Sequence, residues 1–544
     1  MGRVHVVQVY WRACPGKLPR RVEGSRCLLR KYQTIRSEVR VNQRSISRTV
    51  KCGVKAKAHQ DPRSAGKAKI PARGSPVDLH HLRHTEIFAL PGARPARPPL
   101  NSARPQATAS VKMNFVDLTS QGETAWRKEF DRRYLPSNEL IQQVHDILSR
   151  VRADGDAALV EFIHRFDKAQ VTAKEFRVPQ EEITLALGHL DPELRDALSA
   201  SKKNVQEFAQ RSRRNDWQAD NVQGATVGER FDPIRRVGIY VPAGTAPLVS
   251  SAIMTVAIAS AVGVPEIVAV SPVSGSTEMN SALLAALDMA GATEIYKIGG
   301  AHAIGALAFG TESIRPVDKI FGPGNAFVTE AKRQVFGYVA IDLLPGPSEI
   351  LILADHSAVP AWVAADLMAQ AEHGPGTVIA VVSWDKQTLE HVQIEIEKSL
   401  PSLSRQAFLK DVLAERAYAI LARDQEQAVA FANAFAPEHL SIATEDSAEL
   451  ANKVTTAGAI FLGNYSPVAA GDFVAGPSHE LPTGGAAKSF GGLTADQFQR
   501  RTSIVQLDRE SLQKSLPFIL SFSKAERLDA HGASAQIRFV SNRM

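Results

Sequence analysis

The sequence predicts an α/β protein with two doubly wound parallel sheets that follow one another along the chain. From Arg236 onward, short and nearly continuous apolar runs alternate with Ala-rich stretches of helical periodicity, such as residues 250–260. Strands that are apolar on both faces and are joined by helical crossovers are typical of parallel sheets with helices on both sides. Two such series in succession predict two α/β domains.

The predicted strands form two series. The first contains residues 237–241, 266–271, 294–298, 319–321 and 349–354, and the second contains residues 377–383, 417–421, 440–443 and 458–462. Before them, the i, i+3, i+4, i+7 repeat from Ser137 to about Arg214 predicts helices. We therefore expect a helical segment at 113–235 that packs on the first α/β domain at 236–348. A second α/β domain follows at 349–490, and a small helical tail at 491–544.

Charge separates the first 112 residues from the rest of the chain. Residues 1–112 carry 24 Lys and Arg against 5 Asp and Glu, whereas residues 113–544 carry 40 against 52. The basic pI therefore describes this extension, and no nucleic-acid binding is expected of the remainder. The extension is Pro- and Arg-rich without periodicity, so we expect disorder. Three interpretations are open: an upstream stretch before a true start at Met113, which we favour, a transit peptide, or a nucleic-acid-binding tail.

Cysteine usage limits the chemistry. All three cysteines, Cys14, Cys27 and Cys52, lie in the extension. Residues 113–544 therefore have no disulfide, no thiolate metal site and no cysteine nucleophile. No apolar run approaches the ~20 residues of a membrane span. We expect a cytoplasmic protein, or a plastid one if the extension is a transit peptide.

Polar residues that suit a metal site occur in three places. Gln370 and His373 are three residues apart, which places both on one face of the last turn of a predicted helix. Asp472 lies in a Gly- and Pro-rich stretch at 470–487 that is expected to be a functional loop. His531 lies near the C-terminus. These four N and O donors without sulfur suit Zn²⁺ or a similar ion, although each pattern alone also fits an ordinary helix end or turn.

Two further motifs suit catalysis and nucleotide binding. Glu438 and His439 are adjacent before a predicted strand, where they would supply two bases of different strength, although a solvated turn is the alternative. Gly322-Pro-Gly324-Asn325 joins a predicted strand to a helix and could present backbone N–H groups to an anion. It is an incomplete dinucleotide fingerprint and equally fits a plain strand-to-helix turn.

Several segments together resemble the histidinol dehydrogenase family. They are residues 238–244, 298–304, 321–332, 345–349, 370–374, 436–440, 471–485 and 525–531. They occur in the order typical of that family and cover nearly all of 113–544. The resemblance implies two incomplete Rossmann-like domains and a domain-swapped homodimer held by the tail at 491–544. It also implies oxidation of L-histidinol to L-histidine with two NAD⁺ and one Zn²⁺ per subunit, which is the last step of histidine biosynthesis.

The resemblance also implies roles for individual residues. Zinc ligands would be Gln370, His373, Asp472 and His531, which would contact the substrate too, and the acid/base pair would be Glu438 and His439. Other substrate contacts would be Ser348, His479 and Glu526, and NAD⁺ contacts would be Tyr240, His302 and Asn325. Two positions depart from the family: His302 replaces a common glutamine, and Ser478 replaces a common asparagine.

The implied reaction has a specific division of labour. His439 would remove the hydroxyl proton as hydride leaves, and Glu438 would activate water to hydrate the aldehyde before the second oxidation. A thiohemiacetal on cysteine is excluded because the body has no cysteine. Two alternatives remain open: a zinc and NAD dehydrogenase of the same fold that acts on another small alcohol such as a sulfonated diol, or a catalytically inactive NAD- or metal-binding protein.

Overall fold

The computed structural model describes residues 112–120, 128, 130, 132, 135–243, 247–374 and 376–540. Expectations for the extension at 1–112 therefore lie outside the described residues, except for Lys112. Within the described part of the chain, no helix is both long and apolar enough to cross a membrane.

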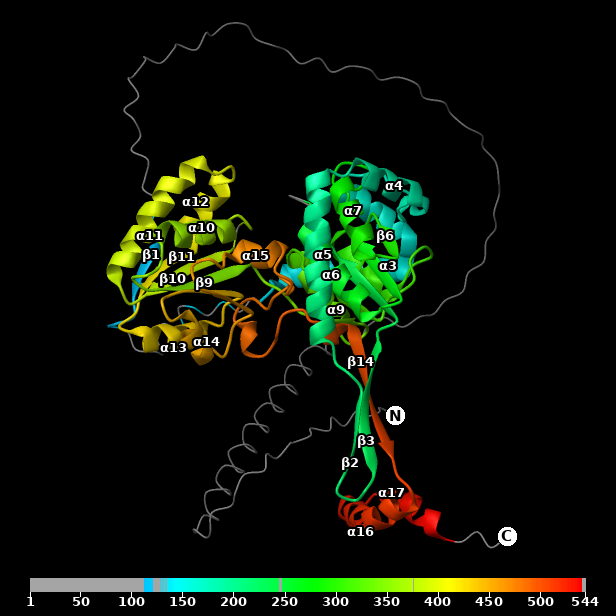
Figure 1. The fold of residues 1–544 in the computed structure, drawn as a ribbon. Coiled ribbons are helices and arrows are strands. Elements are labelled where there is room, and N and C mark those ends of the chain that lie inside the picture. Colours follow the sequence, from blue (N-terminus) through cyan, green and yellow to red (C-terminus); the bar gives the residue numbers. More distant parts are fainter. Residues whose placement is uncertain are drawn as a thin grey trace, which may run out of the picture. The chain divides into compact units, whose positions relative to one another are not determined.

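The first sheet is parallel and doubly wound, as predicted (Figure 1). Its strand order, β6-β5-β4-β7-β8, starts in the middle at β4 and winds outward in both directions. Its strands are β4 (Arg236–Tyr240), β5 (Glu266–Val270), β6 (Glu294–Tyr296), β7 (Lys319–Phe321) and β8 (Ala340–Ile341). The covering helices are α6 (Val249–Val262), α7 (Ser281–Ala290), α8 (Gly300–Phe309) and α9 (Ala326–Val335).

The second sheet repeats this order and adds one edge strand. The order β1-β11-β10-β9-β12-β13 winds outward from β9, and every pairing is parallel. Its strands are β1 (Asn114–Asp117), β9 (Glu349–Ala354), β10 (Val378–Ser383), β11 (Ala417–Leu421), β12 (His439–Ala443) and β13 (Ala459–Leu462). Its helices are α10 (Pro360–Ala371), α11 (Lys386–Ser399), α12 (Gln406–Glu415), α13 (Gln425–Phe435), α14 (Ser447–Lys453) and α15 (Val468–Phe473).

Two hydrophobic cores form on the faces of the second sheet. Along β9, Ile350 and Ile352 belong to one core, and Leu351 and Leu353 belong to the other. Because successive strand residues point to opposite faces, a strand buried on both sides must be apolar throughout. The continuous apolar runs in the sequence therefore predicted the right class of sheet.

The segment at 113–235 is not purely helical, and this part of the prediction was wrong. It contains α3 (Asn138–Phe162), a short π-helical stretch (Ile163–Asp167), α4 (Gln180–His189) and α5 (Pro192–Ser212). Helices α3 and α5 pack on α8 and α6 of the first sheet, as expected. However, β1 pairs with β11 of the second sheet. A four-residue strand at a sheet edge is too short to produce a periodic signal.

A three-stranded antiparallel ribbon was also missed. It consists of β2 (Trp217–Asp220), β3 (Thr226–Pro233) and β14 (Gln499–Gln506), in the order β14-β3-β2. Its strands are largely exposed, so apolar alternation is weak. The tail helices α16 (Arg509–Glu526) and α17 (Asp529–Gln536) follow β14. The tail at 491–544 is therefore not purely helical, because it contains β14. Its role in dimerisation stays a prediction, as does the domain division at 348/349.

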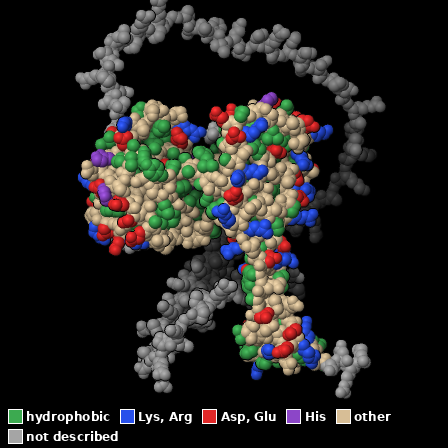
Figure 2. Space-filling view, in the orientation of Figure 1, with side chains coloured by type: hydrophobic (Ala, Val, Ile, Leu, Met, Phe, Trp, Pro, Cys, Tyr) green, Lys and Arg blue, Asp and Glu red, His purple; other side chains and the backbone are tan. Residues whose placement is uncertain are grey.

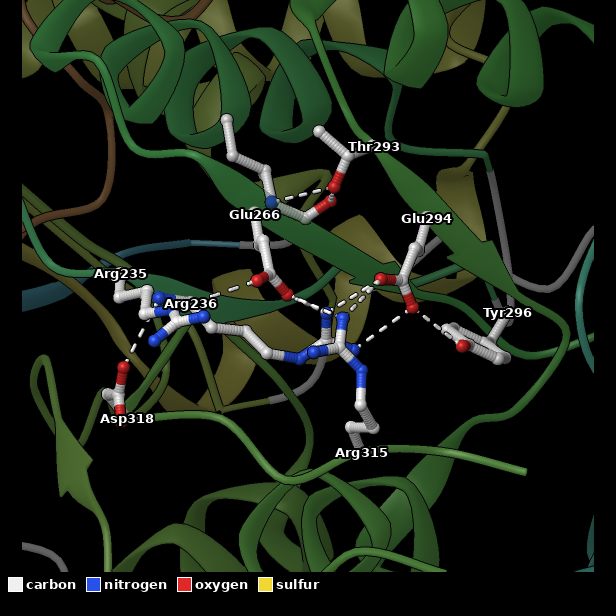
Figure 3. A network of polar contacts seen from close by, with 9 residues as sticks. Arg235, Arg236, Glu266, Thr293, Glu294, Tyr296, Arg315 and Asp318 are labelled. Carbon is white, nitrogen blue, oxygen red and sulfur yellow. Dashed lines mark hydrogen bonds and ion pairs between the residues drawn. The ribbon is translucent and has the colours of Figure 1, made fainter. Parts of the chain in front are cut away.

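A buried ion network joins the strands at the amino edge of the first sheet (Figure 3). The guanidinium of Arg236 contacts the carboxylates of Glu266 and Glu294, each at 2.6 Å, and Arg315 reaches both carboxylates from outside. Hydrogen bonds from Arg236 lower the pKa of Glu294 to about 2. The network lies at the starts of β4, β5 and β6 and therefore fixes the edge opposite the predicted nucleotide site.

Candidate active site

Glu438 and His439 lie at the amino edge of the second sheet. His439 is the first residue of β12 and is in register with Ile350 of β9. Glu438 is 5% exposed, and its Oε2 accepts a hydrogen bond of 2.7 Å from the backbone N–H of Glu349. The pair is thus held in the core by the neighbouring strand, and the alternative of a solvated turn is excluded.

The hydrogen bonds of His439 fix its tautomer. Its Nδ1 lies 3.0 Å from the backbone carbonyl of Glu349, and a carbonyl only accepts, so Nδ1 carries the proton. Nε2 is buried without a hydrogen-bond partner, 3.8 Å from Oδ1 of Asp472. Burial lowers the pKa of His439 to about 4. At neutral pH the ring is therefore neutral, with a free lone pair on Nε2 in the neighbourhood of Asp472.

Two other histidines also have Nδ1 close to a backbone carbonyl. His373 Nδ1 lies 3.0 Å from the carbonyl of Gln370, and His479 Nδ1 lies 3.0 Å from the carbonyl of Asp472. In each ring the backbone holds the Nδ1 proton, so that Nε2 faces away from that bond. Asp472 lies close to two of these rings, with its Oδ1 3.8 Å from His439 Nε2 and its carbonyl 3.0 Å from His479 Nδ1.

The carboxyl group of Glu438 has a perturbed acidity. Burial raises its pKa well above the ordinary value, and the nearby carboxylates of Glu349, Asp472 and Glu480 add to this shift. A carboxylate with a raised pKa is a stronger base than a solvated one. Glu438 is therefore suited to take a proton from water.

Gln370 is the residue most in need of a partner. It lies in the last turn of α10, as the spacing predicted, and His373 follows in the turn after the helix. Its side chain is 1% exposed, and neither its amide oxygen nor its amide nitrogen has a hydrogen-bond partner in the structure. A buried amide without partners is costly, so a ligand such as a metal ion fits here.

Asp472 reaches this cluster from a helix. Stretch 470–487 was expected to be a loop, but α15 extends to Phe473 and carries Asp472. Among the described residues, no three His, Cys, Asp or Glu side chains are placed so that they could hold a metal ion. Gln370, His373 and Asp472 therefore form an incomplete donor set.

His531, the fourth expected ligand, does not join the other three within one chain. It is exposed on α17 and lines a cavity of about 360 Å³ together with Glu526 and Gln223, which lies in the β2–β3 turn. The eight paired residues of β3 and β14 separate this tail from the first sheet, a span of roughly 25 Å. Sequence spacing could not reveal this separation.

The remaining expected substrate contacts lie near the cluster. Ser348 directly precedes β9, and its carbonyl accepts a hydrogen bond from Val378. His479 Nε2 lies 3.2 Å from the hydroxyl of Ser251 on α6. Ser478, which stands where the family commonly has asparagine, donates a 3.0 Å hydrogen bond to the carbonyl of Met254, also on α6. The loop that carries His479 is therefore attached to the first α/β unit.

The three residues expected to contact NAD⁺ line one cavity of about 490 Å³ in the first unit. Tyr240 ends β4, His302 lies in the first turn of α8, and Asn325 precedes α9. His302 is 1% exposed, neither ring nitrogen has a hydrogen-bond partner, and burial lowers its pKa to about 3. Its ring lies beside the stacked pair Phe162 and Phe166, with ring centroids 5.8 and 6.1 Å away.

The N–H groups at the start of α9 are less available than the sequence suggested. The Asn325 side-chain oxygen accepts hydrogen bonds from the N–H groups of Phe327 and Val328, at 3.0 and 3.2 Å. Asn325 is thus the N-cap of this helix, and these two donors are already satisfied. An anion at this helix terminus would therefore have to use other N–H groups of the turn, and anion binding there stays a prediction.

Sequence reasoning missed a buried clamp on the glycine turn. Lys332 and Asp342 form an ion pair, and each side chain is at most 2% exposed. Lys332 donates a 2.8 Å hydrogen bond to the carbonyl of Gly322, and Asp342 accepts one of 2.7 Å from its N–H. Gly322 has φ 104°, and an added Cβ would lie 2.1 Å from the carbonyl oxygen of Tyr240. The clamp therefore fixes the turn between Tyr240 and Asn325.

Comparison with known proteins decides the family. A profile described as histidinol dehydrogenase matches residues 130–539. The histidinol dehydrogenase of Syntrophotalea carbinolica is 42% identical over 403 residues, which cover 74% of this chain and 93% of that protein. The chain belongs to the histidinol dehydrogenase family.

Other members of the histidinol dehydrogenase family agree with this assignment. The Geobacter sulfurreducens enzyme is 40% identical over 431 residues, 78% of this chain and 100% of that protein. The crystal structure of histidinol dehydrogenase from Elizabethkingia anophelis has a TM-score of 0.75 and 34% identity, and covers 78% of this chain and 98% of that one. The fold predicted for a histidinol dehydrogenase is thereby confirmed.

Proposed function

We propose that this protein oxidises L-histidinol to L-histidine in two successive NAD⁺-dependent steps, at a zinc site shared between two copies of the chain. Family membership supports the substrate. The observation that carries the proposal is the cluster at the amino edge of the second sheet, where neutral His439 has a free Nε2 that lies 3.8 Å from Oδ1 of Asp472. This arrangement suits proton removal from an alcohol held beside Asp472.

The chain's residues divide the proton transfers between two bases. His439 takes the hydroxyl proton at Nε2 as hydride leaves the alcohol carbon for the nicotinamide ring, which gives an aldehyde. Glu438, whose pKa burial raises, then takes a proton from water as that water adds to the aldehyde. A second loss of hydride and a proton from the hydrate gives the acid. The carbonyl of Glu349 holds His439 in the reactive tautomer throughout.

The donor set supports zinc. Gln370, His373 and Asp472 offer one amide, one imidazole and one carboxylate, and no cysteine thiolate is available in residues 113–544. Bound zinc would hold the imidazole and amino groups of histidinol and so orient its alcohol carbon. Tyr240, His302 and Asn325 would bind NAD⁺, Ser348, His479 and Glu526 would contact the substrate, and the reaction belongs in the cytoplasm.

Two exposed apolar regions support a homodimer with His531 supplied by a second copy. Beside the second-sheet donors, the exposed side chains include Trp362, Leu462, Tyr465, Phe473 and Val474. On the tail, they include Phe518, Phe522, Leu528, Ile537 and Val540. Figure 2 shows hydrophobic side chains at the surface of the ribbon and tail. Large exposed apolar patches are typical of interfaces, and an isologous pairing would bury both regions twice.

NADH formation by the full-length protein tests the activity. With limiting L-histidinol, we expect two NADH per molecule of substrate and no free aldehyde. One NADH per substrate with release of aldehyde would contradict the four-electron reaction. Activity with a sulfonated diol but none with histidinol would show that the substrate assignment is wrong.

Mixing inactive variants tests the shared site. Gln370→Ala and His531→Ala are each expected to be inactive. In their mixed dimer, one site would combine an intact Gln370 from one chain with an intact His531 from the other, so activity should return. The matched control mixes Gln370→Ala with His373→Ala, whose mixed dimers would have no intact site. Persistent inactivity of the first mixture, with mixed dimers demonstrated, would exclude sharing.

A further inference from the structure

The cavity that holds Tyr240, His302 and Asn325 lies where the strand order of the first sheet reverses. Strand β4 starts the sheet, with β5 on one side and β7 on the other. Tyr240 ends β4, and Pro272 and Ser274 follow β5. Open α/β sheets bind their ligands at this point, outside the carboxyl ends of the strands.

One expected feature of such a site is absent from its usual position. In doubly wound dinucleotide-binding folds, an acidic residue near the end of the second strand binds the ribose hydroxyls of adenosine. Here the second strand is β5, and residues 271–274, which follow it, read Ser-Pro-Val-Ser. No carboxylate stands at the end of this strand to meet the ribose.

Asp167 fills this place from outside the sheet. It ends the short π-helical stretch Ile163–Asp167 that follows α3. Its backbone carbonyl accepts a 2.8 Å hydrogen bond from the N–H of Gly275, which anchors it beside the end of β5. Its side chain lines the same cavity as Pro272, Ser274 and Tyr240. The segment Ile163–Asp167 thus places the carboxylate of Asp167 beside the end of β5, where β5 itself has no acidic residue.

The surroundings of Asp167 suit an adenosine ribose. Its Oδ2 is buried and has no hydrogen-bond partner, so this oxygen can accept a hydrogen bond from a ligand hydroxyl. The residues that line the described cavity include no Lys or Arg. Phe166, the preceding residue, and His302 place two flat rings at the same wall, 6.1 Å apart, next to which a base could pack.

We propose that Asp167 binds the hydroxyls of the adenosine ribose and makes the protein select NAD⁺ over NADP⁺. This inference rests on the proposed function, which assigns the cavity to a nicotinamide cofactor. A ribose diol can donate two hydrogen bonds to one carboxylate. A 2′-phosphate removes one of these donors and brings negative charge against Asp167, in a cavity with no cation among its described lining residues.

Binding of the nucleotides to full-length Asp167→Asn tests this role without any turnover. Isothermal titration would measure Kd for NAD⁺ and NADP⁺, and for ADP-ribose and its 2′-phosphate, which lack the nicotinamide. We expect the ratio of the NADP⁺ Kd to the NAD⁺ Kd to fall by at least about tenfold, because charge-assisted hydrogen bonds to the ribose are lost and repulsion of the phosphate ends. Folding should be retained, since Oδ2 of Asp167 has no hydrogen bond to lose.

Asp146→Asn is the matched control. Asp146 is an exposed carboxylate on α3 that hydrogen-bonds to Gln142, and its loss should leave the ratio unchanged. A second variant, Asp167→Ser, also removes the charge and should lower the ratio in the same way. An unchanged ratio in both Asp167 variants, with nucleotide binding retained, would overturn the role of Asp167. Absence of NAD⁺ binding to the unaltered protein would instead refute the proposed function.

Discussion

Lys332→Met is expected to destabilise the first α/β unit and to weaken NAD⁺ binding. The substitution keeps an apolar stem of similar length but removes the ammonium group. Asp342 would then be a buried carboxylate without its cation, and the carbonyl of Gly322 would lose its 2.8 Å donor. Breaking a buried ion pair on one side costs about 3–5 kcal/mol.

The structure favours the lower end of this range. Asp342 keeps hydrogen bonds from the N–H groups of Gly322 and Leu343, at 2.7 and 2.6 Å. We therefore expect a loss of about 3 kcal/mol. At 2–4 °C per kcal/mol, this loss lowers the Tm of the unit by roughly 6–12 °C in differential scanning calorimetry.

A double variant separates charge burial from positioning. Lys332→Met with Asp342→Leu removes both charges, so most of the lost Tm should return. The turn at Gly322 would still lack both anchors, so the Kd for NAD⁺ should stay raised by roughly tenfold or more. The reasoning is refuted if the single variant is as stable as the double one, or if the double variant binds NAD⁺ normally.

The remaining predictions concern catalysis, metal, backbone and acid stability. Glu438→Gln should slow the histidinal half-reaction by about 10²–10⁴-fold and the histidinol half-reaction less, whereas His439→Asn should impair both in separate NADH assays. Chelation should abolish activity without changing the circular dichroism spectrum, and Zn²⁺ should restore it. Gly322→Ala should lower the free energy of unfolding by about 2–4 kcal/mol in urea titrations, because its Cβ would clash with the carbonyl of Tyr240. The pKa of Glu294 is lowered to about 2, so its stabilising contribution is present above pH 4.5 and is lost as the pH falls toward 2. Glu294→Gln should therefore make the Tm depend less on pH in this acid range.

Each of these predictions has an outcome that would contradict it. Equal losses in both half-reactions for Glu438→Gln would refute the separate role in hydration. Purified active protein without stoichiometric divalent metal would refute the ligand set. An unchanged free energy of unfolding for Gly322→Ala would mean that the turn accommodates a Cβ without strain. An unchanged dependence of Tm on pH for Glu294→Gln would mean that Glu294 does not contribute to acid unfolding.

The sequence predicted the two sheets well because their strands are buried on both faces. Runs at 319–321, 349–354 and 417–421 coincide with β7, β9 and β11, and the other predicted strands differ by one or two residues at their ends. The run at 349–354 was grouped with the first series, but β9 is a central strand of the second sheet. The missed strands are short, exposed or both. In β14, Gln-Arg-Arg-Thr-Ser-Ile-Val-Gln has little apolar alternation, and its pairing with β3 cannot be seen in local sequence.

The candidate site was only partly predictable for the same reason. Spacing placed Gln370 and His373 together, since they share one helix end. Nothing local linked them to Asp472 or His439, which come from other elements. The family resemblance supplied these residues, but it assigned no role to Asp167, Lys332 or Glu349. Their roles follow from hydrogen bonds across the fold, to Gly275, Gly322 and His439 respectively.

The pairing of β3 with β14 has a consequence for biosynthesis. It joins residues 226–233 to residues 499–506, so the whole second sheet must leave the ribosome before β3 finds its partner. During that interval, a β2–β3 hairpin has an open edge, and two-stranded hairpins are marginal in water. Contacts between such distant segments form slowly. We therefore expect the ribbon to close after translation, and chains truncated before Gln499 to be prone to aggregation even when their first sheet is intact.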